Sequence, residues 1–438
     1  MSKITPTINS CRVMAKPSSS VCNLDCEYCF YLEKENLYPE RKANWKMSEE
    51  TLKAYIKQQI NAQFNGEVTF SWQGGEPTLL GIEFYRKAIE LQQHYGSHLT
   101  IHNTFQTNGI LINEDWCNFF KKHNFLVGLS VDGPAGCHDK YRLSRSGKPT
   151  HNKVNRALQL LQKHKVEFNV LTVVNAENAK HPEAVYEYLV SSGVKHIQFI
   201  PLVEQRGNEV TKEGLTLIHP ELDMGYRVTD WSVSAKQYGE FLKGVFDIWV
   251  KRDVGRVFVN MFESTFSAWC GEAPGLCVLS PTCGHNFALE SNGDMYSCDH
   301  YVYPEFKLGN IHQQTILEMN NSEKAIQFGM VKRDQLTEQC KSCIYRSACN
   351  GGCPKHRFIS SSQGQPQHNY FCEGYILFFQ HVTPYMNVMK DLLLKGIAPS
   401  QVMMLLHQSV LASRRNLTTG RNDACQCGSG KKYKRCCM

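Results

Sequence analysis

Eleven cysteines in this chain fall into two groups that have the spacing of iron–sulfur ligands. The upstream group has the pattern Cys-x3-Cys-x2-Cys and consists of Cys22, Cys26 and Cys29. Three thiolates leave one iron of a cubane cluster without a protein ligand, so a small molecule can bind there. The downstream eight are enough for two fully liganded clusters, which transfer electrons or hold structure. They are Cys277, Cys283, Cys298, Cys340, Cys343, Cys349, Cys353 and Cys372.

Structural zinc sites are the alternative interpretation of these cysteines. A zinc ion at the upstream group would need a fourth ligand, and only Cys11 lies nearby, on the other side of the first expected strand. A zinc ribbon could use Cys340 and Cys343, but it leaves six downstream cysteines unexplained. The spacing therefore favours one open cluster beside two closed ones, which indicates radical chemistry with an exit for an electron.

A third group of cysteines lies in the last fifteen residues. Four thiolates within thirteen residues suit one tetrahedral zinc ion, and Gly428 and Gly430 allow the tight turn that this spacing needs. The group consists of Cys425, Cys427, Cys436 and Cys437. A solvated basic tail with incidental cysteines is the alternative. We expect a small zinc module that docks to a partner.

The basic charge of the chain is concentrated in the same tail. Residues 413–438 hold seven lysines and arginines against Asp423, so they carry most of the formal net charge of +7. The remainder of the chain is close to neutral, which argues against a nucleic-acid-binding body. We therefore expect no nucleic-acid partner.

Length and composition favour a globular cytoplasmic protein. The 438 residues are enough for one large domain with smaller ones, and 42% of them are hydrophobic. Residues 1–10 lack the features of a signal peptide, and no apolar run reaches the roughly eighteen residues of a membrane span. Clustered cysteines in a reducing compartment bind metal and do not pair. The unassigned ones are expected to be free buried thiols: Cys11, Cys117, Cys137 and Cys270.

The elements that must position the upstream cysteines alternate between strands and helices. The expected strands are Val13–Lys16, Val68–Trp72, Leu99–Gln106, Phe125–Asp132, Val166–Val174 and His196–Leu202. The expected helices between them are Ser48–Phe64, Ile82–His94, Asn113–His123, Asn152–His164 and His181–Ser192. Six alternations predict the α/β class, with parallel strands in a partial (β/α)6 TIM-like barrel. Functional groups in such a barrel lie after the carboxyl ends of the strands, where the upstream cysteines, Gly74–Pro77 and Thr107–Gly109 fall.

The rest of the chain divides by composition. Glu204–Trp231 is polar and predicts a long loop or lid, Ser234–Arg252 predicts a helix, and Tyr375–Leu411 predicts helices broken near Pro384 and Pro399. The predicted units are a barrel (11–233), a connecting helical segment (234–269), a twin-cluster module (270–373), a C-terminal helical segment (374–412) and a zinc tail (420–438).

Two of these motifs together carry a resemblance to a known superfamily. The loop Cys22–Tyr31 resembles the signature of radical S-adenosylmethionine (SAM) enzymes, and Gly74-Gly75-Glu76-Pro77 resembles their motif for the cofactor's amino group. The resemblance implies that SAM chelates the open iron and is split to a 5′-deoxyadenosyl radical. It also implies a set of cofactor-binding residues: Tyr28, Gly75, Glu76, Ser130, Arg142 and Leu202. Without it, Ser130 would read as a core hydroxyl and Arg142 as a surface cation.

The downstream cysteines resemble the SPASM module, which holds two auxiliary [4Fe–4S] clusters. Cys349-x3-Cys353-Pro354 is similar to the end of a two-cluster ferredoxin run, where the cysteine before proline serves the other cluster. The resemblance therefore implies a crossed partition of the ligands. The first set is Cys277, Cys283, Cys298 and Cys353, and the second is Cys340, Cys343, Cys349 and Cys372. The zinc tail is similar to the SEC-C motif.

From about Val13 to Cys372 the chain resembles the anaerobic sulfatase-maturating enzymes. The matching segments are Met14–Pro17, Ser71–Pro77 and Asn350–Pro354. The resemblance implies that a serine or cysteine of a sulfatase becomes formylglycine and that Asp299 takes the proton from the target's hydroxyl or thiol. By position alone, Asp299 would read as a turn cap. Tyr31 could line the substrate pocket or simply pack.

The implied partners are a sulfatase polypeptide and an electron donor such as flavodoxin or ferredoxin. Two other functions remain open. Another SPASM enzyme would form crosslinks in a peptide, which leaves no carbonyl. An electron-transfer or zinc-dependent interaction protein without catalysis would produce no 5′-deoxyadenosine.

Overall fold

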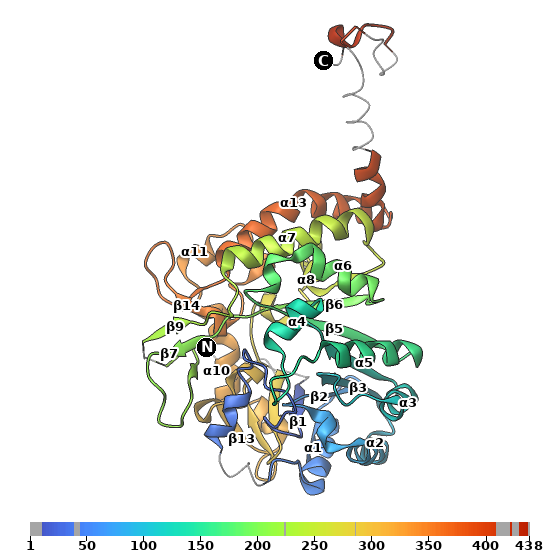
Figure 1. Ribbon diagram of the computed structural model, residues 1–438. Coiled ribbons are helices and arrows are strands. Elements are labelled where there is room, and N and C mark those ends of the chain that lie inside the picture. Colours follow the sequence, from blue (N-terminus) through green and yellow to red (C-terminus); the bar gives the residue numbers. More distant parts are fainter. Residues whose placement is uncertain are drawn as a thin grey trace.

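The computed structural model describes residues 11–38, 44–222, 225–284, 286–408, 421–422 and 429–436. Six parallel strands lie in the order β6-β5-β4-β3-β2-β1, as expected for a partial barrel (Figure 1). They are β1 (Arg12–Lys16), β2 (Glu67–Trp72), β3 (Thr100–Thr107), β4 (Phe125–Ser130), β5 (Phe168–Val174) and β6 (His196–Pro201). The predicted strands are confirmed to within two residues at each end.

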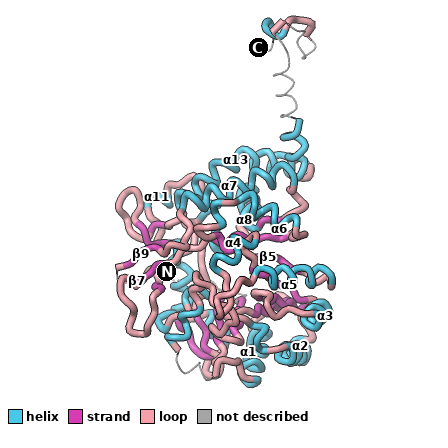
Figure 2. The backbone as a smooth tube through the Cα atoms, in the orientation of Figure 1, coloured by secondary structure: helices cyan, strands magenta, loops and turns pink. Residues whose placement is uncertain are grey.

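Helices follow the strands and cover the outer face of this sheet, while the strands run through the middle of the molecule (Figure 2). They are α1 (Glu49–Asn61), α2 (Ile82–Gly96), α3 (Glu114–Lys122), α4 (Ala135–Tyr141), α5 (His151–Lys163) and α6 (Pro182–Ser191). Side chains alternate along each strand, so that Phe70, Phe105 and Val127 are buried beneath the helices. The alternate positions, such as Ser71, Gln106 and Ser130, are polar and half-buried on the inner face.

The sheet continues beyond the barrel at both edges and reaches ten strands. At one edge β10 (Phe258–Val259) pairs with β6. At the other, β11 (Asn286–Glu290) runs parallel to β1 and is followed by the antiparallel β12 (Asp294–Tyr296) and β13 (Lys307–Asn310). The barrel and the cysteine-rich module therefore share one sheet, across the boundaries predicted at 233 and 270.

The expected loop over Glu204–Trp231 contains a small three-stranded antiparallel sheet, so that prediction was wrong. Its strands are β7 (Gln205–Gly207), β8 (Leu217–Ile218) and β9 (Tyr226–Val228), in the order β8-β7-β9. Each strand is too short to show a periodic pattern. Glu33 fixes the sheet to the barrel, because its Oε2 accepts hydrogen bonds from the backbone nitrogens of Thr216 (2.8 Å) and Leu217 (2.9 Å).

Long helices pack side by side above the sheet (Figure 1). They are α7 (Ala235–Arg252), α8 (Asn260–Cys270) and α13 (Cys372–Leu394). Helices α7 and α13 approach so closely that a Cβ at Gly239 would lie only 2.6 Å from the carbonyl oxygen of Gly374. The contact therefore requires glycine at position 239. The remaining elements are α9 (Ile316–Asn320), α10 (Glu323–Asp334), α11 (Glu338–Lys341), α12 (Arg346–Cys349), β14 (Arg357–Ile359) and β15 (His368–Asn369).

The break expected near Pro384 does not occur, since α13 continues through it. Proline removes one backbone donor, but Phe378, Val382 and Met386 on either side are buried and hold the helix in place. At Pro399 a separate 3-10 turn begins, as predicted (η9, Pro399–Gln401). No helix among the described residues is both long and apolar enough to cross a membrane.

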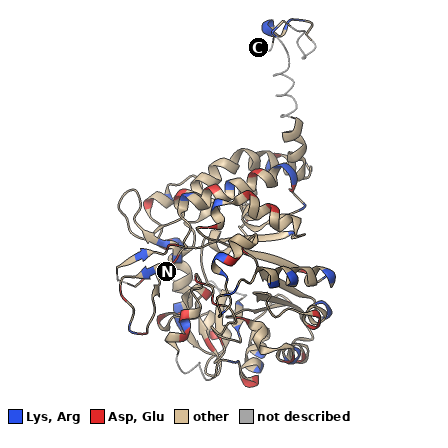
Figure 3. Cartoon of the chain, in the orientation of Figure 1, with Lys and Arg blue, Asp and Glu red and all other residues tan. Residues whose placement is uncertain are grey.

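Along the ribbon of the body, positions of Lys and Arg are interspersed with positions of Asp and Glu (Figure 3). The charges of the near-neutral body are therefore mixed in sign along its elements.

Candidate active site

The three upstream cysteines lie on the loop that follows β1, at the carboxyl edge of the parallel sheet. All three side chains are partly buried. Burial raises the pKa of Cys22 and of Cys26 to about 12, and it raises that of Cys29 as well. Thiols in such surroundings ionise when a metal binds them, so this donor set fits an iron–sulfur cluster.

The glycine-rich loop after β2 lies directly against the cysteine loop. The backbone nitrogen of Gly75 donates to the carbonyl oxygen of Ser19 (2.7 Å), and that of Glu76 donates to the carbonyl oxygen of Val21 (2.9 Å). A Cβ at Gly75 would lie only 2.2 Å from the Val21 oxygen. The absence of a side chain at Gly75 is therefore required for the two loops to meet.

Glu76 holds these loops together through its buried carboxylate. Its Oε1 accepts hydrogen bonds from the backbone nitrogen of Thr78 (3.0 Å) and from the hydroxyls of Thr78 (2.6 Å) and Thr107 (2.8 Å). Its Oε2 accepts from the backbone nitrogen of Asn108 (2.8 Å). Burial raises the pKa of Glu76, while these donors oppose the shift. Its carboxylate is thus engaged by the protein, and the cofactor-binding role that the resemblance implies for Glu76 stays a prediction.

Asn108 lies in the segment Thr107–Gly109, which the sequence placed at the functional edge of the sheet without assigning it a role. Its Nδ2 lies 2.7 Å from Oδ1 of Asn23 and 3.6 Å from Sγ of Cys22. It therefore links the loop after β3 to the first cysteine. Its place directly after a predicted strand was the signal that could have identified it.

Tyr28 and Arg142 meet at the buried carboxylate of Asp132, which the sequence placed at the functional edge of the sheet without assigning it a role. The Tyr28 hydroxyl donates to Oδ2 of Asp132 (2.5 Å), and Nη1 of Arg142 donates to the Tyr28 oxygen (2.8 Å). All three residues are buried. Burial raises the pKa of Asp132, and Arg142 opposes this shift. The side chain of Tyr28 thus fixes the cysteine loop to the end of β4.

Ser130 and Leu202 lie on two sides of this region. Ser130 is at the end of β4, and its Oγ accepts a hydrogen bond from Nε2 of Gln106 (3.0 Å) on the inner face of the barrel. Leu202 belongs to an apolar cluster with Tyr28 and Trp231, against which Cys26 packs. Both residues remain candidates for the cofactor pocket.

Several polar atoms beside the cysteine loop are buried without a partner among the described residues. They are Oγ of Ser18, Oε1 of Gln73 and Nε of Arg142. Buried polar atoms normally form hydrogen bonds. These atoms therefore fit a polar ligand such as SAM.

Asp299 lies next to Lys16, the last residue of β1, and the two form an ion pair. The Lys16 side chain is 2% exposed and that of Asp299 is 23% exposed, so Asp299 is the more open partner of this pair. Burial alone would raise the pKa of Asp299, but Lys16, together with His300, holds it below its usual value. The sequence did not identify Lys16 as a site residue.

Tyr31 completes this corner of the site. The Lys16 ammonium lies 4.1 Å from the centre of the Tyr31 ring, and the Tyr31 hydroxyl donates to Glu290 at the end of β11. Glu290 also accepts a hydrogen bond from Oγ of Ser19 (2.7 Å). The cysteine loop is thus tied to the strand that leads to Asp299.

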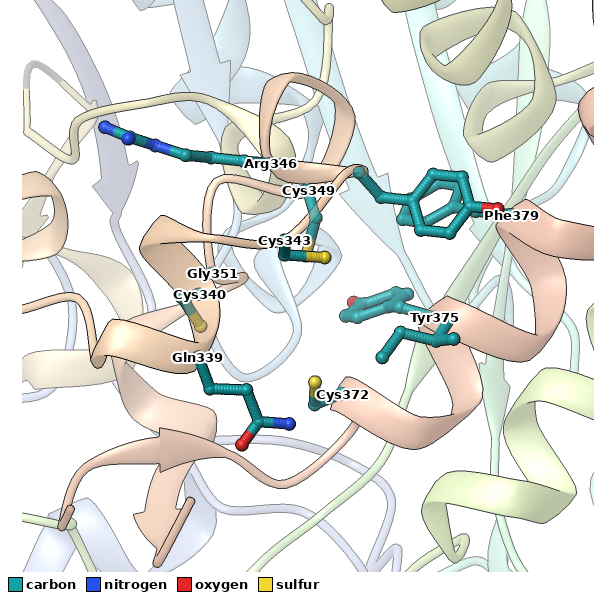
Figure 4. Close-up of a pocket in the computed structure, with 11 residues that line it drawn as sticks. Gln339, Cys340, Cys343, Arg346, Cys349, Gly351, Cys372, Tyr375 and Phe379 are labelled. Carbon is teal, nitrogen blue, oxygen red and sulfur yellow. The ribbon is translucent and has the colours of Figure 1, made fainter. Parts of the chain in front are cut away.

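The second predicted set of auxiliary cysteines lines a single pocket (Figure 4). Its cysteines come from α11, α12, the turn between them and the first residue of α13, and the aromatic wall is formed by Tyr345, Tyr375 and Phe379. Burial and the neighbouring thiols raise the pKa of Cys372 to about 12. The four cysteines at this pocket are Cys340, Cys343, Cys349 and Cys372.

The members of the first predicted set are electrostatic neighbours of one another. Burial raises the pKa of Cys298, and the nearby thiols of Cys353 and Cys277 raise it further. The same holds for Cys283, whose pKa is raised to about 12 by burial and then by Cys353 and Cys277. Cys353 is therefore an electrostatic neighbour of this set although it follows Cys349 by only four positions. The arrangement supports the crossed partition of ligands.

The predicted zinc module lies mostly outside the described residues, which exclude Cys425, Cys427 and Cys437. Cys436 is exposed, and its Sγ lies 3.0 Å from Oγ of Ser429. Zinc binding by this tail stays a prediction.

Three segments of the chain match models of known families. Residues 17–189 match the radical SAM superfamily, residues 281–344 match an iron–sulfur cluster-binding domain, SPASM, and residues 421–438 match the SEC-C motif. Together with the fold and the cysteine sites, these matches show that this chain is a radical SAM enzyme with an iron–sulfur domain.

Curated relatives and solved structures identify the family within the radical SAM enzymes. The chain is 46% identical over 399 residues to the serine-type anaerobic sulfatase-maturating enzyme of Bacteroides thetaiotaomicron, covering 91% of this chain and 96% of that one. It is 36% identical over 381 residues to the cysteine-type enzyme of Clostridium perfringens, covering 85% and 96%. The solved structure "Native anSMEcpe with bound AdoMet and Cp18Cys peptide" has a TM-score of 0.75 at 35% identity, covering 87% and 98%. The chain therefore belongs to the family of anaerobic sulfatase-maturating enzymes.

Proposed function

We propose that this chain oxidises the side chain of a serine or cysteine in a sulfatase polypeptide to formylglycine. The observation that carries the proposal is the position of Asp299. Its partly exposed side chain pairs with Lys16, the last residue of the strand before the cysteine loop, and directly follows Cys298, which we propose as an auxiliary ligand. This position supports a proton acceptor between the proposed radical centre and the proposed electron acceptor.

The chain's residues divide the reaction between them. The three upstream cysteines would hold a cluster to which SAM binds, and this pair would supply the 5′-deoxyadenosyl radical that takes one hydrogen atom from the target Cβ. Asp299 would accept the proton of the target hydroxyl or thiol. Cys298, the residue before Asp299, would be a ligand of an auxiliary cluster, which would accept the remaining electron. The target thus loses two hydrogens in total, and the carbon becomes an aldehyde, or a thioaldehyde that water hydrolyses.

We infer serine as the preferred target, because the serine-type relative from Bacteroides thetaiotaomicron is 46% identical to this chain and the cysteine-type relative from Clostridium perfringens is 36% identical. A reduced flavodoxin or ferredoxin would supply the first electron. The SEC-C tail would dock a partner through a zinc-stabilised surface.

A pair of sulfatase peptides that differ only in serine or cysteine tests this function. We expect the anaerobically reconstituted protein, with reductant and SAM, to form 5′-deoxyadenosine and a hydrazide-reactive peptide aldehyde. Mass spectrometry should show the loss of two hydrogens from the serine peptide. An alanine peptide is the control. A product that has lost two hydrogens but does not react with hydrazide would instead indicate crosslink formation.

Replacement of Lys16, which forms an ion pair with Asp299, provides a second prediction. Lys16→Met should lower the ratio of aldehyde to 5′-deoxyadenosine by about 10-fold, because the carboxylate loses the cation that orients it. Lys16→Arg keeps the charge and should recover part of the ratio. Lys87→Met, which removes an exposed lysine paired with Glu49, is the control. An unchanged ratio in Lys16→Met would show that the ion pair has no part in proton transfer.

A further inference from the structure

Two buried cations lie close to the auxiliary cysteines, and neither forms an ion pair with a carboxylate among the described residues. Lys332 on α10 has a relative exposure of 0%, and Arg357 on β14 has 6%. Nζ of Lys332 donates to the carbonyl oxygens of Cys277 (2.7 Å) and Val278 (3.1 Å). Both cations are thus held at fixed positions.

Arg357 is bonded only to backbone oxygens as well. Its Nε donates to Gly351 (3.0 Å), its Nη1 to Lys332 (2.8 Å) and its Nη2 to Asn350 (3.1 Å). Carbonyl dipoles satisfy the donors but leave the unit charge uncompensated. Burial of a charge without a counter-ion is strongly unfavourable, so a negative group must lie nearby.

Among the described residues, cysteine thiols are the acidic groups that the geometry brings to these cations. Arg357 bonds to the backbone of Asn350 and Gly351, in the segment that joins Cys349 of the second set to Cys353 of the first. Lys332 bonds to the backbone of Cys277, a member of the first set. Arg357 therefore lies between the two sets, and Lys332 lies beside the first. In agreement with this placement, the thiols of Cys340 and Cys283 oppose the lowering of the Arg357 pKa by burial.

The backbone is shaped so that both cations can come this close. A Cβ at Gly351 would lie 2.7 Å from Nη2 of Arg357. On α10, a Cβ at Gly329 would lie 2.6 Å from the carbonyl oxygen of Cys283, whose backbone nitrogen donates to Gly329 (2.9 Å). Glycines thus bring Arg357 against the loop before Cys353 and α10 against Cys283.

We propose that Lys332 and Arg357 are the counter-charges of the two auxiliary clusters and raise their reduction potentials. A [4Fe–4S] cluster with four thiolates is negatively charged, and one-electron reduction adds another negative charge. A fixed, buried cation stabilises the reduced form more than the oxidised form. The use of a raised reduction potential rests on the proposed function, in which the auxiliary clusters accept the electron that leaves the target. The potentials themselves can be measured without any substrate.

The test is a redox titration, monitored by electron paramagnetic resonance, of the full chain in which Cys22, Cys26 and Cys29 are replaced by alanine. Only the auxiliary clusters are then observed. Lys332→Met and Arg357→Gln remove a charge, whereas Lys332→Arg and Arg357→Lys retain it. Lys341→Gln is the matched control, because its side chain is 45% exposed in the same module and water screens its charge.

We expect each charge-removing variant to lower the reduced-to-oxidised ratio at a fixed potential by at least tenfold, equivalent to about 59 mV for a one-electron couple. Charge-retaining variants and Lys341→Gln should stay within about threefold of the parent chain. Iron loss in the charge-removing variants alone would also support the proposal. Full iron content with unchanged potentials in Lys332→Met and Arg357→Gln would overturn it. If Arg357→Gln and Arg357→Lys both misfold and lose iron, the comparison of Lys332→Met with Lys332→Arg decides whether the proposal holds.

Discussion

Replacing Asp299 by asparagine is expected to lower the aldehyde yield by at least about 100-fold, the range over which general bases contribute. Asparagine keeps the size of the side chain but cannot accept the proton. Formation of 5′-deoxyadenosine should stay within a few-fold, because the upstream cysteines and the loop at Gly75 are unchanged. Both products can be measured in one reaction by liquid chromatography and mass spectrometry.

The separation of the two products is the informative result for Asp299→Asn. Asp334→Asn serves as the control, since it removes an exposed carboxylate from the same module. An aldehyde yield equal to that of the parent chain would show that Asp299 does not accept the proton and has only a structural role. Parallel loss of both products would indicate that the change disturbs the neighbouring ligand Cys298 and not proton transfer.

Gly75→Ala is expected to abolish formation of 5′-deoxyadenosine, with a loss above about 100-fold. The new Cβ would lie 2.2 Å from the carbonyl oxygen of Val21 and 2.6 Å from that of Ser20, both backbone atoms that cannot rotate away. The loop that carries Cys22 must therefore shift. The measurements are product yield and binding of SAM at equilibrium.

Gly136→Ala is the matched control for Gly75→Ala, because a Cβ at Gly136 on α4 meets nothing within 4 Å. We expect this variant to behave like the parent chain. Normal SAM cleavage by Gly75→Ala would show that the two loops can separate without consequence. The close approach would then have no role in cofactor binding.

The barrel could be predicted from the sequence because its signals are local. Each strand from β1 to β6 is a short run with a buried alternate face, and each is followed by a helix with its own apolar stripe. The cysteine spacing similarly predicted that Cys340, Cys343, Cys349 and Cys372 gather, and these four line one pocket. The crossing of Cys353 to the other set was implied by the resemblance to a ferredoxin run and stays a prediction.

The features that were missed depend on contacts between distant segments. Lys16 reads as the polar end of a strand, and its importance depends on Asp299, far along the chain. Asp132 gains its role only when Tyr28 reaches it from the cysteine loop. Lys332 and Arg357 look like surface cations until α10 and β14 are placed around the cysteines. Pro384 misled the prediction because tertiary burial outweighed a local preference.

The pairing of β1 with β11 also determines when the protein can complete its fold. Strand β1 emerges first from the ribosome, yet its second neighbour is made only when residues 286–290 have been synthesised. Until then its edge carries unpaired backbone groups, which are prone to pair with other chains. The sheet beside the cysteine loop is therefore complete only when the polypeptide has been made as far as Glu290.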